Sequence, residues 1–159
     1  MSIQQGDIRG VLIAVSGGRL LLPNASVAEV ISYSAPEPIP DAPHWLLGRS
    51  AWRGWRLPLV SFPRLAGWDG TEDEASTKVA ILKLLGGSSC LPYVAVAAQG
   101  FPRLVTVSAH TLITLDEDAG RSARGEQARV LLNEEAAVIP DLEAVERLLE
   151  ETLGLAATA

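Results

Sequence analysis

The chain has 159 residues, 48% of them hydrophobic and 20% charged, a composition typical of one folded domain rather than a disordered segment. Its formal net charge of −6, with scattered arginines, argues against nucleic-acid binding. The single cysteine, Cys90, excludes an intrachain disulfide and a cysteine-based zinc site, and no run reaches the roughly 20 apolar residues of a membrane helix. We therefore expect a reduced, cytoplasmic protein that does not insert into a membrane.

Short apolar runs bounded by turn residues predict strands along most of the chain. Residues 9–16 and 19–23 are two such runs with a Gly-Gly pair, residues 17–18, between them. This arrangement is typical of a hairpin with a two-glycine turn.

Residues 26–33 admit two interpretations. A strand would place Val27, Glu29 and Ile31 on one face, because side chains alternate along a strand. A short helical turn over residues 24–28 is the alternative, and the pattern alone does not decide between them.

Four prolines in residues 36–43 predict an extended loop, since each proline fixes its own φ and restricts the residue before it. Residues 45–52 and 55–62 then predict two strands, with the Arg-Gly pair at 53–54 as the turn between them. Pro58 cannot donate a ladder hydrogen bond, so we expect its strand to be an edge or bulged there.

A polar segment at residues 67–77 is the best internal boundary of the single domain, which covers residues 1–159. The apolar runs after it predict further strands at 78–85, 90–98 and 101–108, a polar loop at 115–127, and two strands within 128–140 around residues 133–135. We expect a mainly all-β fold of eight to ten strands in two similar halves, residues 9–66 and 77–140, allowing for strand exchange between them.

Only residues 141–153 predict a helix. Asp141 can cap it, and apolar side chains recur on one face at Leu142, Val145, Leu148 and Leu149. Gly154 is suited to end it.

Candidate catalytic groups are isolated in the sequence. His44 and His110 have no partner at metal-ligand spacing, and no serine lies in a nucleophile elbow. The acidic clusters at 72–74 and 116–118 lack the alternating spacing of a calcium loop, and Cys90 has no basic neighbour to lower its pKa. We expect no catalytic, cofactor or metal site and therefore not an enzyme.

Three of the four tryptophans lie within eleven residues. Trp45 is expected in the core. Trp52 and Trp55, three residues apart across a turn, need not share a face. With Arg53 between them they suit a protein contact, or alternatively a small-molecule-binding β module with an Arg/Trp clamp for an acidic ligand.

The order of these motifs resembles the CheW-like domain, the adaptor module of bacterial chemosensory arrays, over about residues 9–150. The spacing from Gly48 to Arg53 and the proline-containing strand after it follow the family pattern. The matching segments are 22–23, 27–31, 43–48, 52–54, 57–60 and 64–67. The Trp-rich variant is most similar to the ChpC-type adaptors of type IV pilus chemosensory systems.

The resemblance implies two small five-stranded β-barrels side by side with a C-terminal helix. It implies a non-enzymatic adaptor without cofactor, coupling the cytoplasmic tip of chemoreceptors to the regulatory domain of a chemotaxis-type histidine kinase, in a pilus or twitching-motility pathway. The residues it assigns to partner binding are Val27, Glu29, Gly48, Trp52, Arg53, Gly54 and Trp55.

Three positions depart from the family pattern. Trp52 replaces a usual aliphatic residue, and Ser61-Phe62 stand where an acid is usual. Residues 98–101 read Ala-Gln-Gly-Phe in place of a Val-Asp-x-Val run.

Overall fold

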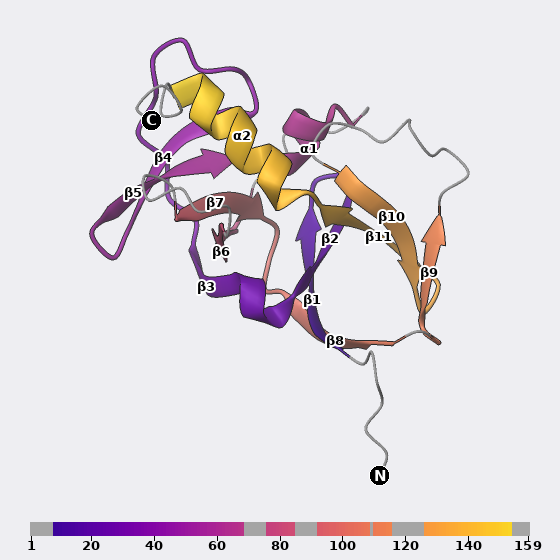
Figure 1. Cartoon of the computed structure of the whole chain (residues 1–159). Helices are drawn as coiled ribbons and strands as arrows, with labels where there is room; N and C mark the ends of the chain where they lie inside the picture. Colours follow the sequence, from indigo (N-terminus) through magenta and orange to yellow (C-terminus); the bar gives the residue numbers. More distant parts are fainter. Residues whose placement is uncertain (1–7, 69–75, 85–91, 109, 116–125, 154–159) are drawn as a thin grey trace.

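The computed structural model describes residues 8–68, 76–84, 92–108, 110–115 and 126–153. Most of this part of the chain is β-structure (Figure 1). Its strands are β1 (Ile8–Val15), β2 (Gly18–Pro23), β3 (Val27–Ser32), β4 (Leu46–Trp52), β5 (Trp55–Val60), β6 (Lys78–Lys83), β7 (Tyr93–Ala98), β8 (Arg103–Val107), β9 (Leu112–Leu115), β10 (Glu126–Leu132) and β11 (Glu135–Pro140). Its helices are α1 (Phe62–Ala66), α2 (Leu142–Leu153) and the short 3₁₀ helix η1 (Asn24–Ser26).

The strands form two sheets, and each sheet takes strands from both halves of the chain. Sheet A has the order β8-β1-β2-β11-β10-β9, and sheet B has the order β3-β6-β7-β5-β4. The hairpin β1-β2 therefore lies with the C-terminal strands, while β6 and β7 lie with β3–β5 (Figure 1). The mainly β, two-sheet fold with a C-terminal helix is as predicted, with six strands in one sheet in place of five.

Sheet A must curl, because its two edge strands are neighbours in sequence. In a flat sheet, five strand spacings would separate β8 from β9 by about 24 Å. The chain from Val107 to Leu112 joins these edges and spans at most about 18 Å when extended. The sheet therefore bends until its edges approach, giving it the form of a barrel.

Sheet B is closed by the proline-containing loop that follows β3. Ser32 is the last residue of β3, on one edge of the sheet, and Glu37 pairs with Arg49 on the free side of β4 at the other edge. Two backbone hydrogen bonds of 2.9 and 2.8 Å join Glu37 and Arg49. Only four residues lie between Ser32 and Glu37, so this sheet also has to curl.

The largest apolar core lies between the two curled sheets, and each sheet has a smaller core of its own. The central cluster includes Val11 and Leu22 from sheet A, Leu82 and Val96 from sheet B, and Leu149 from α2. Separate clusters fill the inner face of each sheet. Strands β1, β2, β6 and β7 are therefore buried on both faces, which explains their nearly continuous apolar sequences.

Helix α2 lies across the junction of the two sheets (Figure 1). Asp141 Oδ1 accepts a hydrogen bond of 3.1 Å from the backbone N–H of Ala144, the expected cap. Val145 and Leu149 are buried in the central core, with Leu142 and Leu148 packed beside it. The predicted apolar face of this helix is confirmed.

Helix α1 was not predicted, since residues 55–62 were assigned wholly to a strand. The strand ends at Val60, and Ser61 caps the helix with its side chain accepting from the N–H of Arg64 at 3.5 Å. Pro63 suits the first turn, and Gly67 ends the helix with φ 75°.

The segment before β3 combines both interpretations left open by the sequence. Residues Asn24–Ser26 form η1, and the strand follows from Val27. A bulge between Val27 and Glu29 breaks the alternation, so Val27 packs against the central core while Ile31 packs inside sheet B. The prediction that Val27 and Ile31 share a face was wrong because a bulge adds one residue to the strand.

The predicted hairpins are present, with one shift of position. Val15 pairs with Gly18, so the first loop consists of Ser16 and Gly17 rather than the two glycines. The pair Trp52 and Trp55 brackets the second loop at residues 53–54, as predicted. The turn within residues 133–135 likewise follows the prediction, with β10 ending at Leu132 and β11 beginning at Glu135.

Pro58 is neither at a sheet edge nor at the bulge of its hairpin. Strand β5 lies between β7 and β4, and its ladder with β7 covers only Leu59 and Val60. Pro58 therefore belongs to the part of β5 that pairs only with β4, opposite Arg49. The missing N–H is tolerated because this stretch has one neighbouring strand.

Strand β9 was not predicted, and β10 begins at Glu126, inside the expected loop. The turn proposed between residues 85 and 90, the acidic clusters 72–74 and 116–118, Cys90 and Gly154 lie outside the described residues.

Candidate functional site

The β4-β5 hairpin carries four of the predicted partner-binding residues on one projecting loop. Arg53 and Gly54 form the turn with φ 48° and 83°, the left-handed conformation of a two-residue hairpin turn that twists with its strands. The flanking Trp52 and Trp55 are direct cross-strand partners, so their side chains lie on the same face. The sequence alone did not require Trp52 and Trp55 to share a face, and the structure shows that they do.

Glu29 on β3 joins the hairpin to the neighbouring edge of sheet B. Its Oε1 accepts a hydrogen bond of 2.9 Å from Trp52 Nε1 and one of 3.0 Å from Arg53 Nε. The Arg53 guanidinium also lies over the Trp52 ring, 5.4 Å from its centroid. We call Glu29, Trp52 and Arg53 the exposed cluster.

These contacts favour the charged form of Glu29. The Trp52 hydrogen bond first, and then the Arg53 hydrogen bond and charge, lower the pKa of Glu29 below its usual value. The carboxylate is therefore a fixed acceptor at neutral pH that orients both side chains. Arg53 remains largely exposed, with 69% of its side chain accessible.

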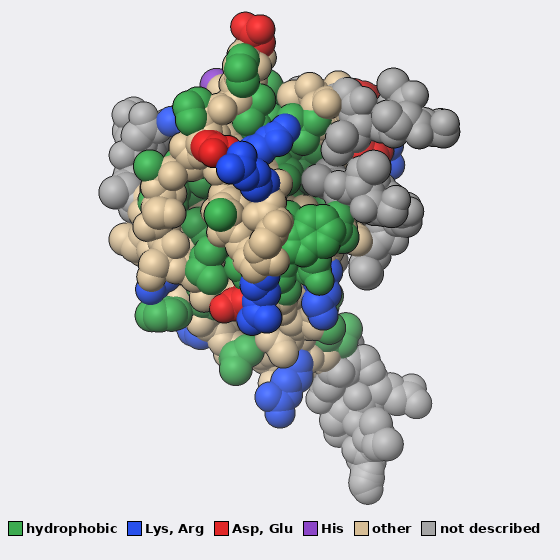
Figure 2. All heavy atoms as spheres, turned by 90° about the vertical axis from the view of Figure 1, so that its left-hand side faces the viewer, with side chains coloured by type: hydrophobic (Ala, Val, Ile, Leu, Met, Phe, Trp, Pro, Cys, Tyr) green, Lys and Arg blue, Asp and Glu red, His purple; other side chains and the backbone are tan. Residues whose placement is uncertain are grey.

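Tyr93 on β7 supports the two indoles from beneath. Its ring lies edge to face with both indoles, with its centroid 4.9 Å from the ring centroid of Trp52 and 6.0 Å from that of Trp55. Trp55 is nonetheless exposed, at 42% of its surface. On the face seen in Figure 2, apolar side chains lie among Lys and Arg side chains, with fewer Asp and Glu side chains visible.

Gly48 and Val27 lie apart from this hairpin tip. Gly48 is buried with φ 146°, and a Cβ there would lie 2.3 Å from the carbonyl oxygen of Glu37. Its place is thus fixed by the loop that closes sheet B. Val27 is half-buried against the central core.

A second set of residues repeats the chemistry of the exposed cluster in a buried setting. Glu126 on β10 accepts hydrogen bonds from Trp68 Nε1 and from Nε and Nη2 of Arg129, the latter two at 2.8 and 2.9 Å. The Glu126 side chain is completely buried, whereas the Arg129 side chain is 56% exposed. We call Glu126, Trp68 and Arg129 the buried cluster, which sequence reasoning missed because Trp68 and Glu126 are 58 residues apart.

Exposed apolar side chains gather at the start of β8. Phe101 is 75% exposed with Lys78 Nζ 4.2 Å from its ring centroid, and Leu104 is 65% exposed. We call Phe101 and Leu104 the apolar edge. The sequence signal was available, since Phe101 stands in the segment that departs from the family pattern.

The described residues show little that resembles a catalytic or metal centre. His44 and His110 are exposed, and no group of three His, Cys, Asp or Glu side chains within the described ranges is placed to hold a metal ion. Across the same ranges, no helix has the length and apolar character needed to cross a membrane. Trp45 is buried in the central core, as predicted.

The alternative of an Arg/Trp clamp for an acidic ligand is not favoured by this geometry. The carboxylate that such a clamp would bind is already supplied by Glu29. An anion arriving at Arg53 would have to compete with an intramolecular partner that is held close by the fold.

Comparison with known proteins supports the fold independently. Residues 9–150 match the CheW-like domain. A search of the curated proteins finds no match to the sequence. The crystal structure of scaffolding protein TtCheW from Thermoanaerobacter tengcongensis is similar, with a TM-score of 0.68 and 13% identity over 84% of this chain and 88% of that chain. Because the match to the CheW-like domain covers residues 9–150, most of the length of the chain, the chain belongs to the CheW-like domain family.

Proposed function

We propose that the protein is a non-enzymatic, cytoplasmic scaffold of a chemosensory array that couples chemoreceptors to a chemotaxis-type histidine kinase. The observation that carries this proposal is the match of residues 9–150 to the CheW-like domain. In this proposal two separate surfaces serve the two partners.

The exposed cluster and Trp55 would bind the regulatory domain of the kinase. A Trp and Arg pair at a projecting turn has the composition of a protein contact centre. Glu29 holds Arg53 and Trp52 in place before binding, which reduces the entropy lost on association. The exposed face of the Arg53 guanidinium would then meet acidic or carbonyl groups of the partner.

The apolar edge would bind the helical tip of the receptor. Phe101 and Leu104 expose apolar surface that association would remove from water. A receptor helix can place an apolar stripe against them. Lys78, held over Phe101, supplies a charge beside that stripe.

A ChpC-type role in type IV pilus signalling is the finer form of this proposal. It is supported by the indoles of Trp52 and Trp55, where the family usually has an aliphatic residue at the first position. The two indoles and Tyr93 form one aromatic group. We expect tighter binding to a kinase of a pilus system than to one of a flagellar system from the same cell.

The kinase surface is tested by measuring affinity for the purified kinase regulatory domain by biolayer interferometry. We expect Arg53→Glu to weaken binding about 10-fold or more. The matched control is Arg103→Glu, since Arg103 forms a similar ion pair with Glu135 on sheet A and is also more than half exposed. Equal affinities for both variants, with folding verified, would contradict this assignment.

A charge swap separates contact from positioning. Because Arg53 and Glu29 are ion-paired, the double variant Glu29→Arg with Arg53→Glu restores an internal pair of opposite orientation. If Arg53 touches the kinase, affinity stays low in the double variant. Recovery of affinity would show that Arg53 only positions the hairpin.

The receptor surface is tested with a soluble fragment of the receptor tip. We expect Leu104→Ser to weaken receptor binding and leave kinase binding unchanged. The control is Ile113→Ser, which alters a comparably exposed side chain on β9, the strand that the curl of sheet A brings toward β8. A loss of receptor binding in the control alone would rule out the apolar edge.

A further inference from the structure

Trp68 belongs to the part of the chain that follows sheet B, but its side chain binds to sheet A. It comes after α1, which continues from β5, and its backbone N–H donates to the carbonyl oxygen of Pro63 in α1 at 3.0 Å. Its Nε1 donates to Glu126, the first residue of β10. The six-membered ring of the indole lies against Gly18 of β2, where a Cβ would be 3.0 Å from Cζ3 of Trp68. The side chain therefore meets sheet A at two strands.

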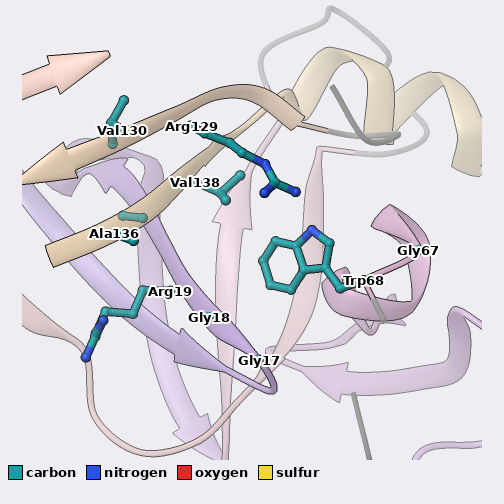
Figure 3. Close-up of a pocket in the computed structure, with 10 residues that line it drawn as sticks. Gly17, Gly18, Arg19, Gly67, Trp68, Arg129, Val130, Ala136 and Val138 are labelled. Atoms are coloured by element: carbon teal, nitrogen blue, oxygen red, sulfur yellow. The ribbon is translucent and has the colours of Figure 1, made fainter. Parts of the chain in front are cut away.

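Arg129 holds the acceptor of the indole hydrogen bond in place. Its Nε and Nη2 donate to the two carboxylate oxygens of Glu126, at 2.8 and 2.9 Å. Figure 3 shows the guanidinium of Arg129 and the indole of Trp68 pointing toward one another. Because Glu126 and Arg129 both belong to β10, their ion pair stays with sheet A and presents a fixed oxygen to the indole. We call the hydrogen bond between Trp68 and Glu126 the latch.

The indole of Trp68 is open to a pocket on one side. This pocket of about 430 Å³ lies between the β1-β2 turn, the end of α1 and the β10-β11 hairpin, and Trp68 and Val138 are among its lining residues (Figure 3). Packing therefore does not hold the ring from every direction. Hydrogen bonds are directional, whereas apolar burial is not. The latch and the close approach to Gly18 hence set where the ring lies.

The two sheets also touch along β1 and β7, away from the latch. There the backbone N–H of Gln99, just after β7, donates to the carbonyl oxygen of Ala14 in β1 at 2.9 Å. Within sheet A, β2 and β11 separate β1 from β10. Contact along β1 alone would let sheet A rotate about that line, and a second bond at β10 prevents the rotation. Helix α2 adds apolar contacts at the junction, which resist separation of the sheets more than sliding.

We propose that Trp68 and Glu126 are positioning residues whose bond fixes the angle between the two sheets and thereby couples the kinase surface to the receptor surface. The exposed cluster belongs to sheet B, and Leu104 of the apolar edge belongs to β8 of sheet A. A change transmitted from one surface to the other has to cross the junction of the sheets. The role in coupling rests on the proposed scaffold function, whereas the fixed angle does not.

The angle is tested by double electron–electron resonance with one spin label on each sheet. The labels are attached through Ala51→Cys on β4 and Thr114→Cys on β9, both exposed positions on edge strands, in a Cys90→Ser chain that has no other cysteine. We expect one narrow distance distribution. Trp68→Phe deletes the Nε1 donor and leaves the ion pair on β10 intact, so the distribution should widen about twofold or more.

Two controls separate the latch from other effects of substitution. Trp52→Phe removes an indole hydrogen bond to a glutamate within sheet B, and Ile81→Val removes a methylene group from the inner core of that sheet. Both should keep the narrow distribution. The latch is overturned if Trp68→Phe gives the same width as the parent, or if Ile81→Val widens the distribution equally.

The role in coupling is tested with the unlabelled chain, the kinase and the receptor. Trp68→Phe should bind each partner alone with unchanged affinity, yet reduce the receptor-dependent change in kinase autophosphorylation about fivefold or more. An unchanged response, or a loss that Ile81→Val reproduces, would overturn this role. If the wild-type chain binds neither partner, the scaffold function fails, while the distance distributions still decide whether the latch fixes the angle.

Discussion

Glu29 and Glu126 each accept hydrogen bonds from an indole and from an arginine, yet they lie in opposite surroundings. The Glu29 side chain is 37% exposed at the edge of sheet B, while the Glu126 side chain is completely buried. Glu29 joins β3 to a projecting hairpin of its own sheet. Glu126 joins a strand of sheet A to Trp68, which follows α1 and packs against the core between the sheets.

The difference shows that one set of side-chain bonds serves different purposes at different depths. In the buried cluster, the carboxylate of Glu126 is out of contact with water, so its charge depends on its donors and loss of a donor weakens the fold. In the exposed cluster, water can replace a lost partner, so the same bonds contribute little to stability. What they provide there is a fixed orientation of groups that a partner can contact.

The largest expected effect comes from removing the buried carboxylate. Glu126→Ala removes the charge-assisted hydrogen bonds that its carboxylate accepts from Trp68 Nε1 and from Arg129, and we expect a loss of about 3 kcal/mol in unfolding free energy. Urea denaturation followed by circular dichroism measures it. Glu29→Ala is the matched variant and should shift the denaturation midpoint far less; equal shifts would show that burial does not distinguish the clusters.

A smaller loss of stability is expected where the proline-containing loop closes sheet B. Gly48→Ala places a Cβ against the Glu37 carbonyl oxygen at a φ of 146°, so we expect a loss of about 2 kcal/mol. Thermal or urea unfolding measures this change. Gly54→Ala serves as the comparison, because that position has a positive φ but open space around it; an equal or larger loss there would mean that the close approach at Gly48 is unimportant.

The exposed cluster should make stability depend on pH in acid. Because the folded-state pKa of Glu29 is lowered, protons bind the unfolded chain first as pH falls. Its contribution is therefore complete above the ordinary glutamate value of about 4.3 and is lost as pH falls through the lowered folded value. The difference in stability between wild type and Glu29→Gln should shrink over that window; a difference that grows in acid would contradict the lowered pKa.

The smallest effect expected is a change in the pKa of Glu29 when one of its hydrogen-bond donors is removed. Trp52→Phe keeps an aromatic ring beside Tyr93 but deletes the Nε1 donor, so the pKa of Glu29 should rise toward its usual value. Titration of the Glu29 carboxyl carbon by ¹³C NMR measures it. Trp55→Phe, which retains both donors to Glu29, is the control and should leave the titration unchanged.

Much of the fold could be predicted because local signals and tertiary structure agree. Glycine and polar turns mark the hairpins, and the apolar face of residues 142–149 marks α2. The errors occurred where a single residue changes the geometry. A bulge in β3 turned Val27 away from Ile31, and Ser61 began a helix in the middle of an expected strand.

The candidate site was predicted only in part. The resemblance identified Glu29, Trp52 and Arg53 as residues of interest, and the structure shows them bonded together. Nothing in the sequence connected Trp68 with Glu126, because their contact joins the chain after α1 to the first residue of β10. A hydrogen bond across 58 residues has no local signature.

The sequence by itself determined a mainly β domain of the CheW-like family, because strand periodicity, turn residues and motif spacing are properties of neighbouring residues. The tertiary structure alone decided which strands share a sheet and which carboxylates are buried. Sheet A takes β1 and β2 from one end of the chain and β8–β11 from the other. Pairing and burial depend on the packing of the whole chain, and this packing makes one Glu-Trp-Arg cluster a structural link and leaves the other exposed to partners.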